Sequence, residues 1–306
     1  MTVAAKIAVT GGTGFVGQAV LDVMAQRGIA VRALARNVPD NRPEVEWISG
    51  NLGDAGALGE LVSGTDAVIH IAGLTNTPDP AQFEAANVAG TAAMLDTAQQ
   101  AGVRRFVFVS SLSAREPKLS AYGASKAAAE DLVARSKLDW TTVRPPAVYG
   151  PRDSDMLELF RSARYGFIPL PPSGATSMIH VGDLATLLID LLPSSALIRR
   201  KTFEPDDGRE GGWSYKEMAA AIGDAVGRRV FAPNLPANLL RGAAQLDRLL
   251  RGGNAKLTAD RVGYMCHPNW VARSDKAVPR DIWTPSVETR AGLKSTAEWY
   301  REQGWL

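Results

Sequence analysis

Several features that would direct a sequence toward cross-linking, metal binding or polyanion binding are scarce here. Cys266 is the only cysteine among 306 residues, and there are three histidines. A single cysteine excludes an internal disulfide framework and fits a reducing compartment. Cys266 and His267 are neighbours, but no metal-ligand spacing accompanies them, so we expect no metal site. The formal net charge of +2 is too small to favour nucleic acid as a partner.

Long apolar runs are also missing. No run reaches the roughly 20 residues that a membrane-spanning helix needs. The first strand is expected to begin by about residue 5, which leaves no room for a signal peptide. Internal repeats and low-complexity tracts are absent as well. We therefore expect a cytoplasmic protein without a membrane span.

Close to the start of the chain lies a glycine-rich turn between an apolar run, at residues 7–9, and a helix-like pattern. Its glycines have the spacing of a dinucleotide fingerprint: one permits a tight turn, one lets backbone N–H groups approach a pyrophosphate, and one lets the helix pack against the strand. A tight loop of no chemical function is the alternative. The predicted cofactor-binding residues here are Gly11, Gly12, Thr13, Gly14, Phe15, Val16 and Gly17.

The residue after the second expected strand, at 30–35, bears on the choice of cofactor. An NAD site would carry Asp or Glu about twenty residues after the fingerprint, to bind the ribose 2′-hydroxyl. This chain has Arg36 instead. A guanidinium pairs with a 2′-phosphate, so Arg36 favours NADP, with NAD possible. The alternative is a surface arginine without a ligand.

Two further strand ends are candidates for cofactor contact. Asn51 and Leu52 follow a short strand at 45–48 and are expected under the adenine ring, while Asp54 either joins them or caps the next helix. Ala72 and Gly73 follow a buried strand, where their small size lets a cofactor pass. His70 lies inside that strand and is expected to be a hydrogen-bonded core residue.

Strands alternating with helices predict an α/β fold, a Rossmann-type doubly wound parallel sheet. We expect residues 1–150 to form the NAD(P)-binding domain, with 178–194 returning to it, and 151–306 to form a smaller substrate-capping region. Within that region five leucines recur at helical spacing, which favours a buried helix face, with an apolar substrate lid as the alternative. They are Leu239, Leu240, Leu246, Leu249 and Leu250.

Tyr122 and Lys126 are the strongest candidates for chemistry. Four residues apart on an expected helix, they share one face. A free phenol has a pKa near ~10, and an adjacent ammonium would stabilise the phenolate and lower that value. Ser111, at the end of the strand at 105–109, is placed to hydrogen-bond a substrate carbonyl. An exposed tyrosine and lysine on a surface helix is the alternative, which the upstream glycine turn disfavours.

Together these motifs resemble the extended short-chain dehydrogenase/reductases of the NAD-dependent epimerase/dehydratase family. The resemblance covers essentially the whole chain, including the segments 144–151 and 179–183. It implies that Pro145, Ala147 and Val148 contact the cofactor, together with Tyr122 and Lys126. It also implies a monomer or homodimer acting on a small molecule.

Departures from the family pattern narrow the expected substrate. Sugar-nucleotide members often carry Asn near the position of Ala147 and Arg where this chain has Thr176 and Ser177. An alanine side chain cannot hydrogen-bond a sugar diphosphate, and neither threonine nor serine supplies a bidentate cation for it. The pattern looks more like the dihydroflavonol reductase and 3β-hydroxysteroid dehydrogenase branch, which acts on apolar carbonyl compounds.

That branch implies an NADP-dependent oxidoreductase for a carbonyl or secondary alcohol. Ser111 would polarise the carbonyl, Tyr122 would act as general acid or base, and Lys126 would tune it. Asn87 either supports a proton path or bonds backbone as an ordinary helix residue. A nucleotide-sugar epimerase or dehydratase with bound NAD, and a non-catalytic NADP-binding sensor or assembly factor, are the alternative functions.

Overall fold

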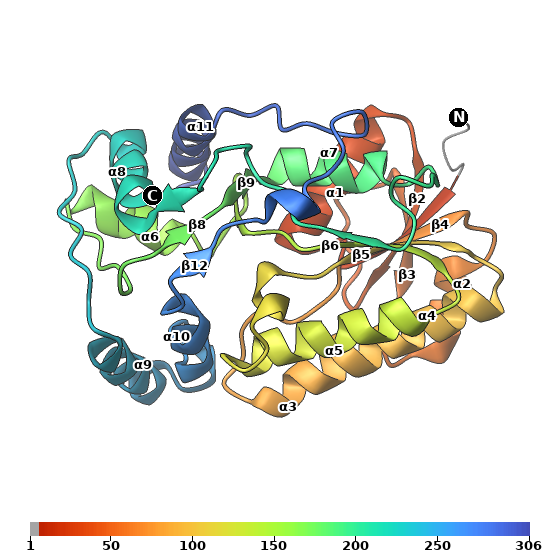
Figure 1. Cartoon of the computed structure of the whole chain (residues 1–306). Coiled ribbons are helices and arrows are strands. Elements are labelled where there is room, and N and C mark those ends of the chain that lie inside the picture. The colour runs from red at the N-terminus through yellow and green to blue at the C-terminus, as the bar shows by residue number, and fades with distance from the viewer. Residues whose placement is uncertain (1–5) are drawn as a thin grey trace. The chain divides into compact units, whose positions relative to one another are not determined.

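The computed structural model describes residues 6–306, and Figure 1 shows the course of the chain. By their internal contacts these residues form two compact units. The first comprises residues 6–144, Leu184–Phe203 and Val278–Thr284, and the second comprises Pro145–Asp183, Glu204–Ala277 and Pro285–Leu306. It stays a prediction that residues 1–150, joined by 178–194, form the NAD(P)-binding domain and that residues 151–306 form the substrate-capping region.

A seven-stranded parallel sheet forms the centre of the first unit. Its strand order is β10-β6-β5-β4-β1-β2-β3. The interior strand β1 pairs with β2 on one side and β4 on the other, so that Ile7 lies opposite both Val31 and Ala67. This order reverses direction at β1, as in dinucleotide-binding folds. The strands are β1 (Lys6–Thr10), β2 (Ala30–Ala35), β3 (Val45–Ser49), β4 (Ala67–His70), β5 (Arg105–Val109), β6 (Asp139–Val143) and β10 (Lys201–Phe203).

Helices cover both faces of this sheet (Figure 1), which confirms the predicted Rossmann-type architecture. The helices α2 (Ala55–Val62), α4 (Gly90–Gln100) and α5 (Ala121–Arg135) lie on one face, and α1 (Phe15–Gln26) and α7 (Val181–Asp190) on the other. Short helical segments precede α4 and α5. They are α3 (Pro80–Phe83), the π-helix η1 (Glu84–Ala89) and η2 (Leu112–Arg115).

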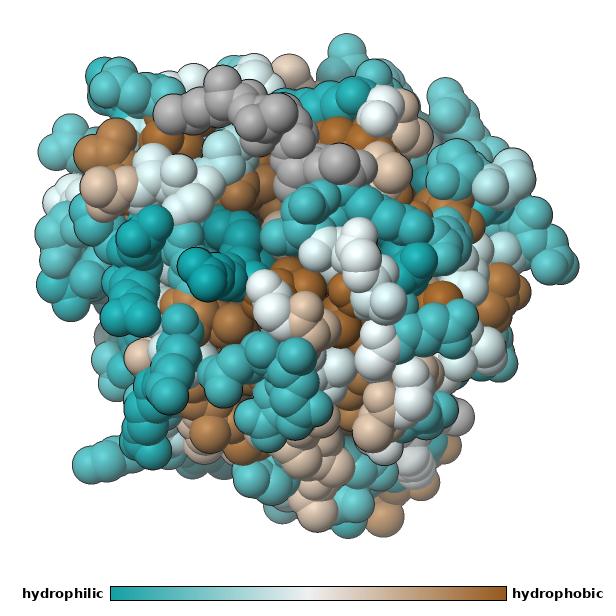
Figure 2. All heavy atoms as spheres, turned by 90° about the vertical axis from the view of Figure 1, so that its right-hand side faces the viewer, coloured by the Kyte–Doolittle hydropathy of each residue, from teal (hydrophilic) through white to brown (hydrophobic). Residues whose placement is uncertain are grey.

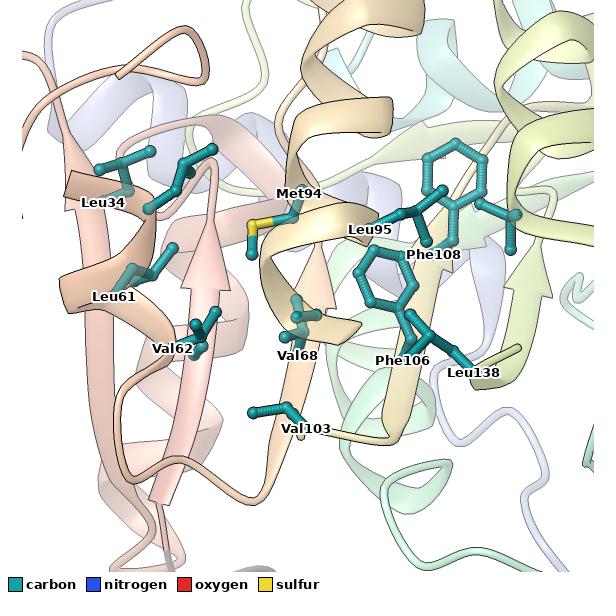
Figure 3. Packing of buried hydrophobic residues seen from close by; sticks show 14 of the residues in the cluster. Leu34, Leu61, Val62, Val68, Met94, Leu95, Val103, Phe106, Phe108 and Leu138 are labelled. Carbon is teal, nitrogen blue, oxygen red and sulfur yellow. The ribbon is translucent and has the colours of Figure 1, made fainter. Parts of the chain in front are cut away.

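The core beneath α2, α4 and α5 is built from the apolar side chains of alternate strand positions. Phe106 and Phe108 of β5 pack with Leu95 of α4, and Leu61 of α2 packs with Leu34 of β2 in the same cluster (Figure 3). These side chains are almost fully buried. Because strands and helices both contribute, the carboxyl ends of the strands are held in fixed positions for the residues that follow them.

The second unit combines short strands with helices around its own core. β7 (Ala147–Tyr149) pairs in parallel with β9 (Met178–His180), and β8 (Ala175–Thr176) pairs with β11 (Trp213–Ser214) and β12 (Asn269–Trp270). The core includes Tyr149, Phe160, Leu293 and Tyr300. The helical segments are α6 (Leu157–Arg164), α8 (Tyr215–Val226), α9 (Ala237–Arg251), η3 (Gly252–Asn254), α10 (Ala259–Met265), η4 (Ser274–Lys276) and α11 (Thr289–Glu302).

One expectation for the second unit is wrong. The leucines of α9 were predicted to form a buried face, but only Leu240 is buried, whereas Leu239, Leu246, Leu249 and Leu250 are exposed. The physical reason is that α9 packs on α10 through one narrow side, at Leu240 and Ala244. Within residues 6–306 no helix has both the length and the apolar composition needed to cross a bilayer.

Candidate active site

The glycine turn between β1 and α1 is shaped by close backbone contacts. Gly11 has φ +77°, in the region that favours glycine. The Gly14 N–H donates to the Gly11 carbonyl at 3.0 Å, which closes the turn. A Cβ on Gly17 would lie 2.7 Å from the Gly11 carbonyl carbon and 2.8 Å from the Gly12 Cα. Glycine is therefore required at 11 and 17 to bring the helix this close to the turn.

The first turn of α1 is suited to an anion. Gly14 is its N-cap and supplies no side-chain hydrogen bond, and no acidic residue lies in this turn. The N–H groups of Phe15 and Val16 therefore point outward at the positive end of the helix dipole, with Thr13 exposed beside them. These groups fit the pyrophosphate of a dinucleotide.

Arg36 follows β2 directly and is exposed. The neighbouring arginines are engaged elsewhere: Arg32 pairs with Glu46 at 2.7 Å and Arg42 with Asp22 at 2.6 Å. Within residues 6–306 Arg36 forms no ion pair. Its guanidinium is accordingly available to a 2′-phosphate at the carboxyl edge of the sheet.

The loop after β3 is ordered by its own polar groups. The Asn51 Oδ1 accepts from the Gly53 N–H at 2.8 Å, and Leu52 packs against Gly90, where a Cβ would lie 3.1 Å from the Leu52 Cβ. Asp54 accepts from the Ala57 N–H at 3.0 Å and caps α2. The capping alternative for Asp54 is confirmed, and contact of Asn51 and Leu52 with adenine stays a prediction.

The loop after β4 lies against the glycine turn. A Cβ on Gly11 would be 2.7 Å from the Ala72 nitrogen, so the two backbones touch. A Cβ on Gly73 would be 3.0 Å from the Asn87 Oδ1 and 3.6 Å from the Lys126 Nζ. Because residues 72 and 73 are small, the glycine turn and the Lys126 ammonium both lie close to the loop after β4.

His70 is buried at the centre of a hydrogen-bond chain. Thr91 Oγ1 donates to the Asn87 carbonyl at 2.6 Å, so its oxygen must accept the proton of His70 Nε2 at 3.1 Å. Nδ1 then accepts from Thr10 Oγ1 at 2.7 Å, which in turn accepts from the Ala72 N–H at 3.2 Å. Burial lowers the pKa of His70 to about 3, so the imidazole is neutral. The expectation of a satisfied core histidine is confirmed.

Asn87, on the π-helix η1, joins the same loop to α5. Its Oδ1 accepts from the Leu74 N–H at 2.7 Å, and its Nδ2 donates to the Leu74 carbonyl at 3.0 Å and to Ser125 Oγ at 2.9 Å. Ser125 Oγ donates to the Tyr122 carbonyl at 2.8 Å. Of the two expectations for Asn87, backbone bonding is confirmed, and a proton path stays a prediction.

Tyr122 and Lys126 lie on α5, one turn apart, and both are buried. The helix begins cleanly because Ser120 Oγ accepts from the Gly123 N–H at 2.9 Å. The Tyr122 ring lies 5.8 Å from that of Phe83, centroid to centroid. Lys126 Nζ donates to the Val109 carbonyl at 2.7 Å and lies 4.9 Å from the Phe108 ring centre.

Burial lowers the pKa of Lys126 to about 8, partly opposed by Glu130. At neutral pH the amine is still mostly protonated, but it has lost much of its solvation. A desolvated ammonium interacts strongly with any anion beside it, because the local dielectric constant is low. Lys126 is therefore able to stabilise a phenolate or bind a ribose.

Ser111 follows β5 and is half-buried. Its Oγ accepts from the Ser113 N–H at 3.2 Å, which leaves the hydroxyl proton for another acceptor. Beside it, Ser110 Oγ donates to Glu130 at 2.5 Å, and Glu130 pairs with Arg144 Nη2 at 2.6 Å. The structure thus brings Ser111, Tyr122 and Lys126 into the same unit, with β5 and α5 fixed to each other through Glu130.

A family model described as NAD(P)H-binding matches residues 11–193 of this chain. The chain belongs to this family. The match includes the glycine turn, Ser111, Tyr122 and Lys126. The predicted extended short-chain dehydrogenase/reductase family is confirmed, and relatives include proteins of the dihydroflavonol reductase and 3β-hydroxysteroid dehydrogenase types.

Reductases are among the most similar members of the NAD(P)H-binding family. A ceramide reductase of Caulobacter vibrioides is 34% identical over 310 residues, covering 98% of this chain and 96% of that protein. A 2-alkyl-3-oxoalkanoate reductase of Stenotrophomonas maltophilia is 29% identical, covering 94% of this chain and 97% of that protein. The chain is therefore an enzyme of an NAD(P)-dependent oxidoreductase family.

Among solved structures, the Bordetella bronchiseptica enzyme WbmG, in complex with NAD and UDP, superposes with a TM-score of 0.76. It is 19% identical and the match covers 99% of this chain and 97% of that one. At this identity the likeness shows the fold.

The other residues that were predicted to contact the cofactor lie in the second unit. Ala147 and Val148 are in β7, paired with Met178 and Ile179, and Pro145 precedes them. Their contact with a cofactor stays a prediction. His180 packs edge-on against Tyr149 at 5.4 Å and accepts from the Gly182 N–H at 3.1 Å, which accounts for it as a packing residue.

Some residues that organise the site were not singled out from the sequence. Glu130 lies one turn after Lys126 on α5, and that i, i+4 spacing was a usable signal. Thr10 and Thr91 carried none, because their partner His70 is distant in sequence. In the second unit Asp183 accepts from the Ser286 and Val287 N–H groups at 3.1 and 3.0 Å, which gives the aspartate of the segment 179–183 a structural role.

Proposed function

We propose that this protein is an NADPH-dependent reductase of a ketone carried by a long-chain, largely apolar molecule. The observation that carries the proposal is the Tyr122 and Lys126 pair on α5, with the Lys126 ammonium desolvated at the carboxyl end of β5. The two reductases, whose alignments cover 98% and 94% of this chain, support the reaction class, and both are named for substrates with alkyl chains. The reverse reaction would oxidise the corresponding secondary alcohol.

Each residue has a distinct role in this proposal. NADPH, when bound, supplies the hydride that reduces the carbonyl carbon. Ser111 donates its hydroxyl proton to the carbonyl oxygen in a hydrogen bond and so polarises it. Tyr122 transfers its phenolic proton to the same oxygen as negative charge develops there. Lys126 favours the resulting phenolate and would hold bound NADPH by a hydrogen bond to its nicotinamide ribose.

Arg36 determines the choice of NADP over NAD in this account. It is exposed at the end of β2 and its neighbours Arg32 and Arg42 are already paired. An acidic residue, which would repel a 2′-phosphate, is absent from positions 35–37.

The nucleotide-sugar alternative has less support from the side chains. Ser177 stands where sugar-nucleotide members often carry arginine, and its hydroxyl already has partners within this chain. Its Oγ donates to Asp206 at 2.7 Å and accepts from the Ala272 N–H at 3.1 Å. Ala147 has no polar side-chain atom. A non-catalytic sensor would have no need of the Tyr122 and Lys126 pair.

Tyr122→Phe tests the proposal in an NADPH-consumption assay on long-chain 3-oxo esters. We expect kcat to fall by about 100-fold or more, because the proton donor is lost. The matched control Tyr165→Phe, at a side chain that is 87% exposed, should leave kcat unchanged. Equal turnover by Tyr122→Phe and wild type would overturn the proposal, and NADPH consumption by the wild type would end the sensor alternative.

A further inference from the structure

The apolar side chains of α9 form an unusual surface. Leu249 is 83% exposed, Leu250 76%, Leu239 57% and Leu246 56%. Leu239, Leu246 and Leu250 are spaced by seven and four residues, so they project from one side of the helix, and Leu249 borders them. Isolated exposed leucines are common, but four on one short helix mark a surface that binds something.

This surface is not part of the unit's own core. α9 packs on α10 through Leu240 and Ala244, which are buried with Val262 in a small cluster. The exposed leucines do not join that cluster, because at about 100° per residue they lie roughly 100–160° around the helix axis from the mean direction of Leu240 and Ala244. Figure 1 shows α9 and α10 as a helical pair at the end of the segment that leads down from α8.

The segment that contains this helix is strongly basic. Residues 228–262 include seven basic and two acidic side chains, although the whole chain has a net charge of only +2. Of the basic residues, Lys256 pairs with Glu158 at 2.5 Å, Arg261 with Asp155 at 3.3 Å and Arg251 with Asp247 at 3.2 Å. Within the described part of the chain no ion pair engages the others, Arg228, Arg229, Arg241 and Arg248, all of which are exposed.

Exposed leucines on a helix within a basic segment are the combination that binds an anionic lipid surface. The arginines supply attraction that acts over about 10 Å, so they need not border the leucines, and the leucines supply the apolar contact that follows. Phe231, which is 69% exposed, precedes α9 in the same basic segment, where its ring packs against that of Phe167 with the centroids 6.2 Å apart. By contrast, hydrophilic residues cover much of the face seen in Figure 2, and the hydrophobic areas between them are small and separated.

We infer that α9 docks this protein on the surface of a bilayer that contains anionic lipid. The helix lies on the membrane with Leu239, Leu246, Leu249 and Leu250 among the acyl chains, and the chain does not cross it. The inference rests on α9 and its charges alone and is independent of the reaction proposed above. It would give the enzyme direct access to a substrate that resides in the membrane.

Vesicle flotation of the full chain tests this inference. We expect the protein to float with vesicles of phosphatidylcholine and phosphatidylglycerol, and to bind at least tenfold less to phosphatidylcholine alone, given about fivefold per interacting arginine. The variant Leu246→Gln/Leu249→Gln/Leu250→Gln should lose at least about tenfold in binding. Leu197→Gln, at an exposed leucine of the first unit, is the matched control and should bind as wild type does.

Three results would overturn the inference. The first is no flotation of the wild type with the anionic vesicles, and the second is undiminished flotation of the triple variant. The third is a wild-type dimer in analytical ultracentrifugation that the triple variant converts to monomer, because a second copy would then cover α9. NADPH binding, followed by nucleotide fluorescence, should be equal in all variants, which separates this test from that of the proposed function.

Discussion

Two buried titratable side chains of the first unit respond to burial in the same direction and with different outcomes. Burial lowers the pKa of Lys126 to about 8 and that of His70 to about 3. At neutral pH Lys126 therefore stays mostly charged, while His70 is neutral. The charged group is suited to stabilising an anion, whereas the neutral imidazole is suited to holding Thr10 and Thr91 with one donor and one acceptor.

Replacing Lys126 tests how much burial of its charged amine reduces the free energy of unfolding. In the unfolded chain its pKa is near 10.5 and in the folded protein about 8, so between these pH values the unfolded state binds more protons and the wild type gains stability as pH rises. We expect Lys126→Met to lose turnover by about 100-fold or more. Its free energy of unfolding, relative to wild type, should fall as pH rises from 8 to 10, as measured by urea denaturation. If the difference in free energy of unfolding between the variant and wild type stayed constant over this range, burial would not lower the pKa of Lys126 in the folded protein.

His70→Phe tests the hydrogen-bond chain. A folded pKa of about 3, below the ordinary 6.5, means that the wild type loses stability as pH falls from about 6.5 toward 3. The variant should be less stable at pH 7 by about 2–4 kcal/mol, because two buried hydroxyls lose their partner, and should lack that part of the acid dependence. Urea denaturation at pH 7 and pH 5 measures both. The control His267→Gln should lose stability at acid pH as wild type does. If neither variant showed this loss of stability, the acid dependence could not be assigned to His70.

At the scale of elements, the sequence was informative where local chemistry decides the structure. The glycine spacing predicted the turn between β1 and α1 because only glycine tolerates the contacts around Gly11 and Gly17. The carboxyl-edge placement of Ser111 and the shared face of Tyr122 and Lys126 followed from strand and helix periods. These features depend on neighbours in sequence, so one chain was enough to find them.

Other elements depend on packing that the sequence does not display. The π-helix η1 presents Asn87 to Leu74 and Ser125, which are 13 and 38 residues away in sequence, so no local pattern predicts these contacts. The exposure of Leu246 and Leu249 was mispredicted for a related reason. An apolar helix face has the same period whether it meets a core or a membrane.

Gly17→Ala tests the packing of α1 on the glycine turn. The new Cβ would lie 2.8 Å from the Gly12 Cα and 2.7 Å from the Gly11 carbonyl carbon, so the turn must move. We expect NADPH affinity to fall by about tenfold or more and the protein to lose roughly 1–3 kcal/mol of stability. Gly59→Ala, inside α2 with no atom within 4 Å of the new Cβ, is the control. It should leave NADPH affinity unchanged and stabilise by about 0.5–1 kcal/mol; a similar loss of affinity in both would contradict the account.

For the whole molecule, the fold and the reaction are separate questions. The same architecture, at 19% identity, binds NAD and UDP in WbmG, and the strand order β3-β2-β1-β4-β5-β6 is shared by many dinucleotide-binding proteins. The proposed preference for NADPH and an apolar substrate over a nucleotide sugar therefore rests on particular side chains of this chain. They are Arg36 after β2, and Ala147 and Ser177 in the second unit.

Thermal unfolding of the whole chain separates these ligand classes. A ligand that binds only the folded state at 100 times its Kd stabilises by about 2.7 kcal/mol, which should raise Tm by several degrees. We expect NADPH to produce this shift, Arg36→Ala to lose most of it, and UDP-glucose to produce none. A Tm increase with UDP-glucose would favour the epimerase alternative.

The most direct test of the central claim is to follow the hydride itself. The protein is incubated with NADPH deuterated at C4 and a long-chain 3-oxo ester, and the product is analysed by mass spectrometry. We expect a secondary alcohol that carries one deuterium on the former carbonyl carbon, formed by wild type and not by Tyr122→Phe. The test is run with each of the two C4 stereoisomers of the labelled cofactor. The proposed hydride transfer would be contradicted if both left the ketone unchanged, or if both gave an alcohol without deuterium.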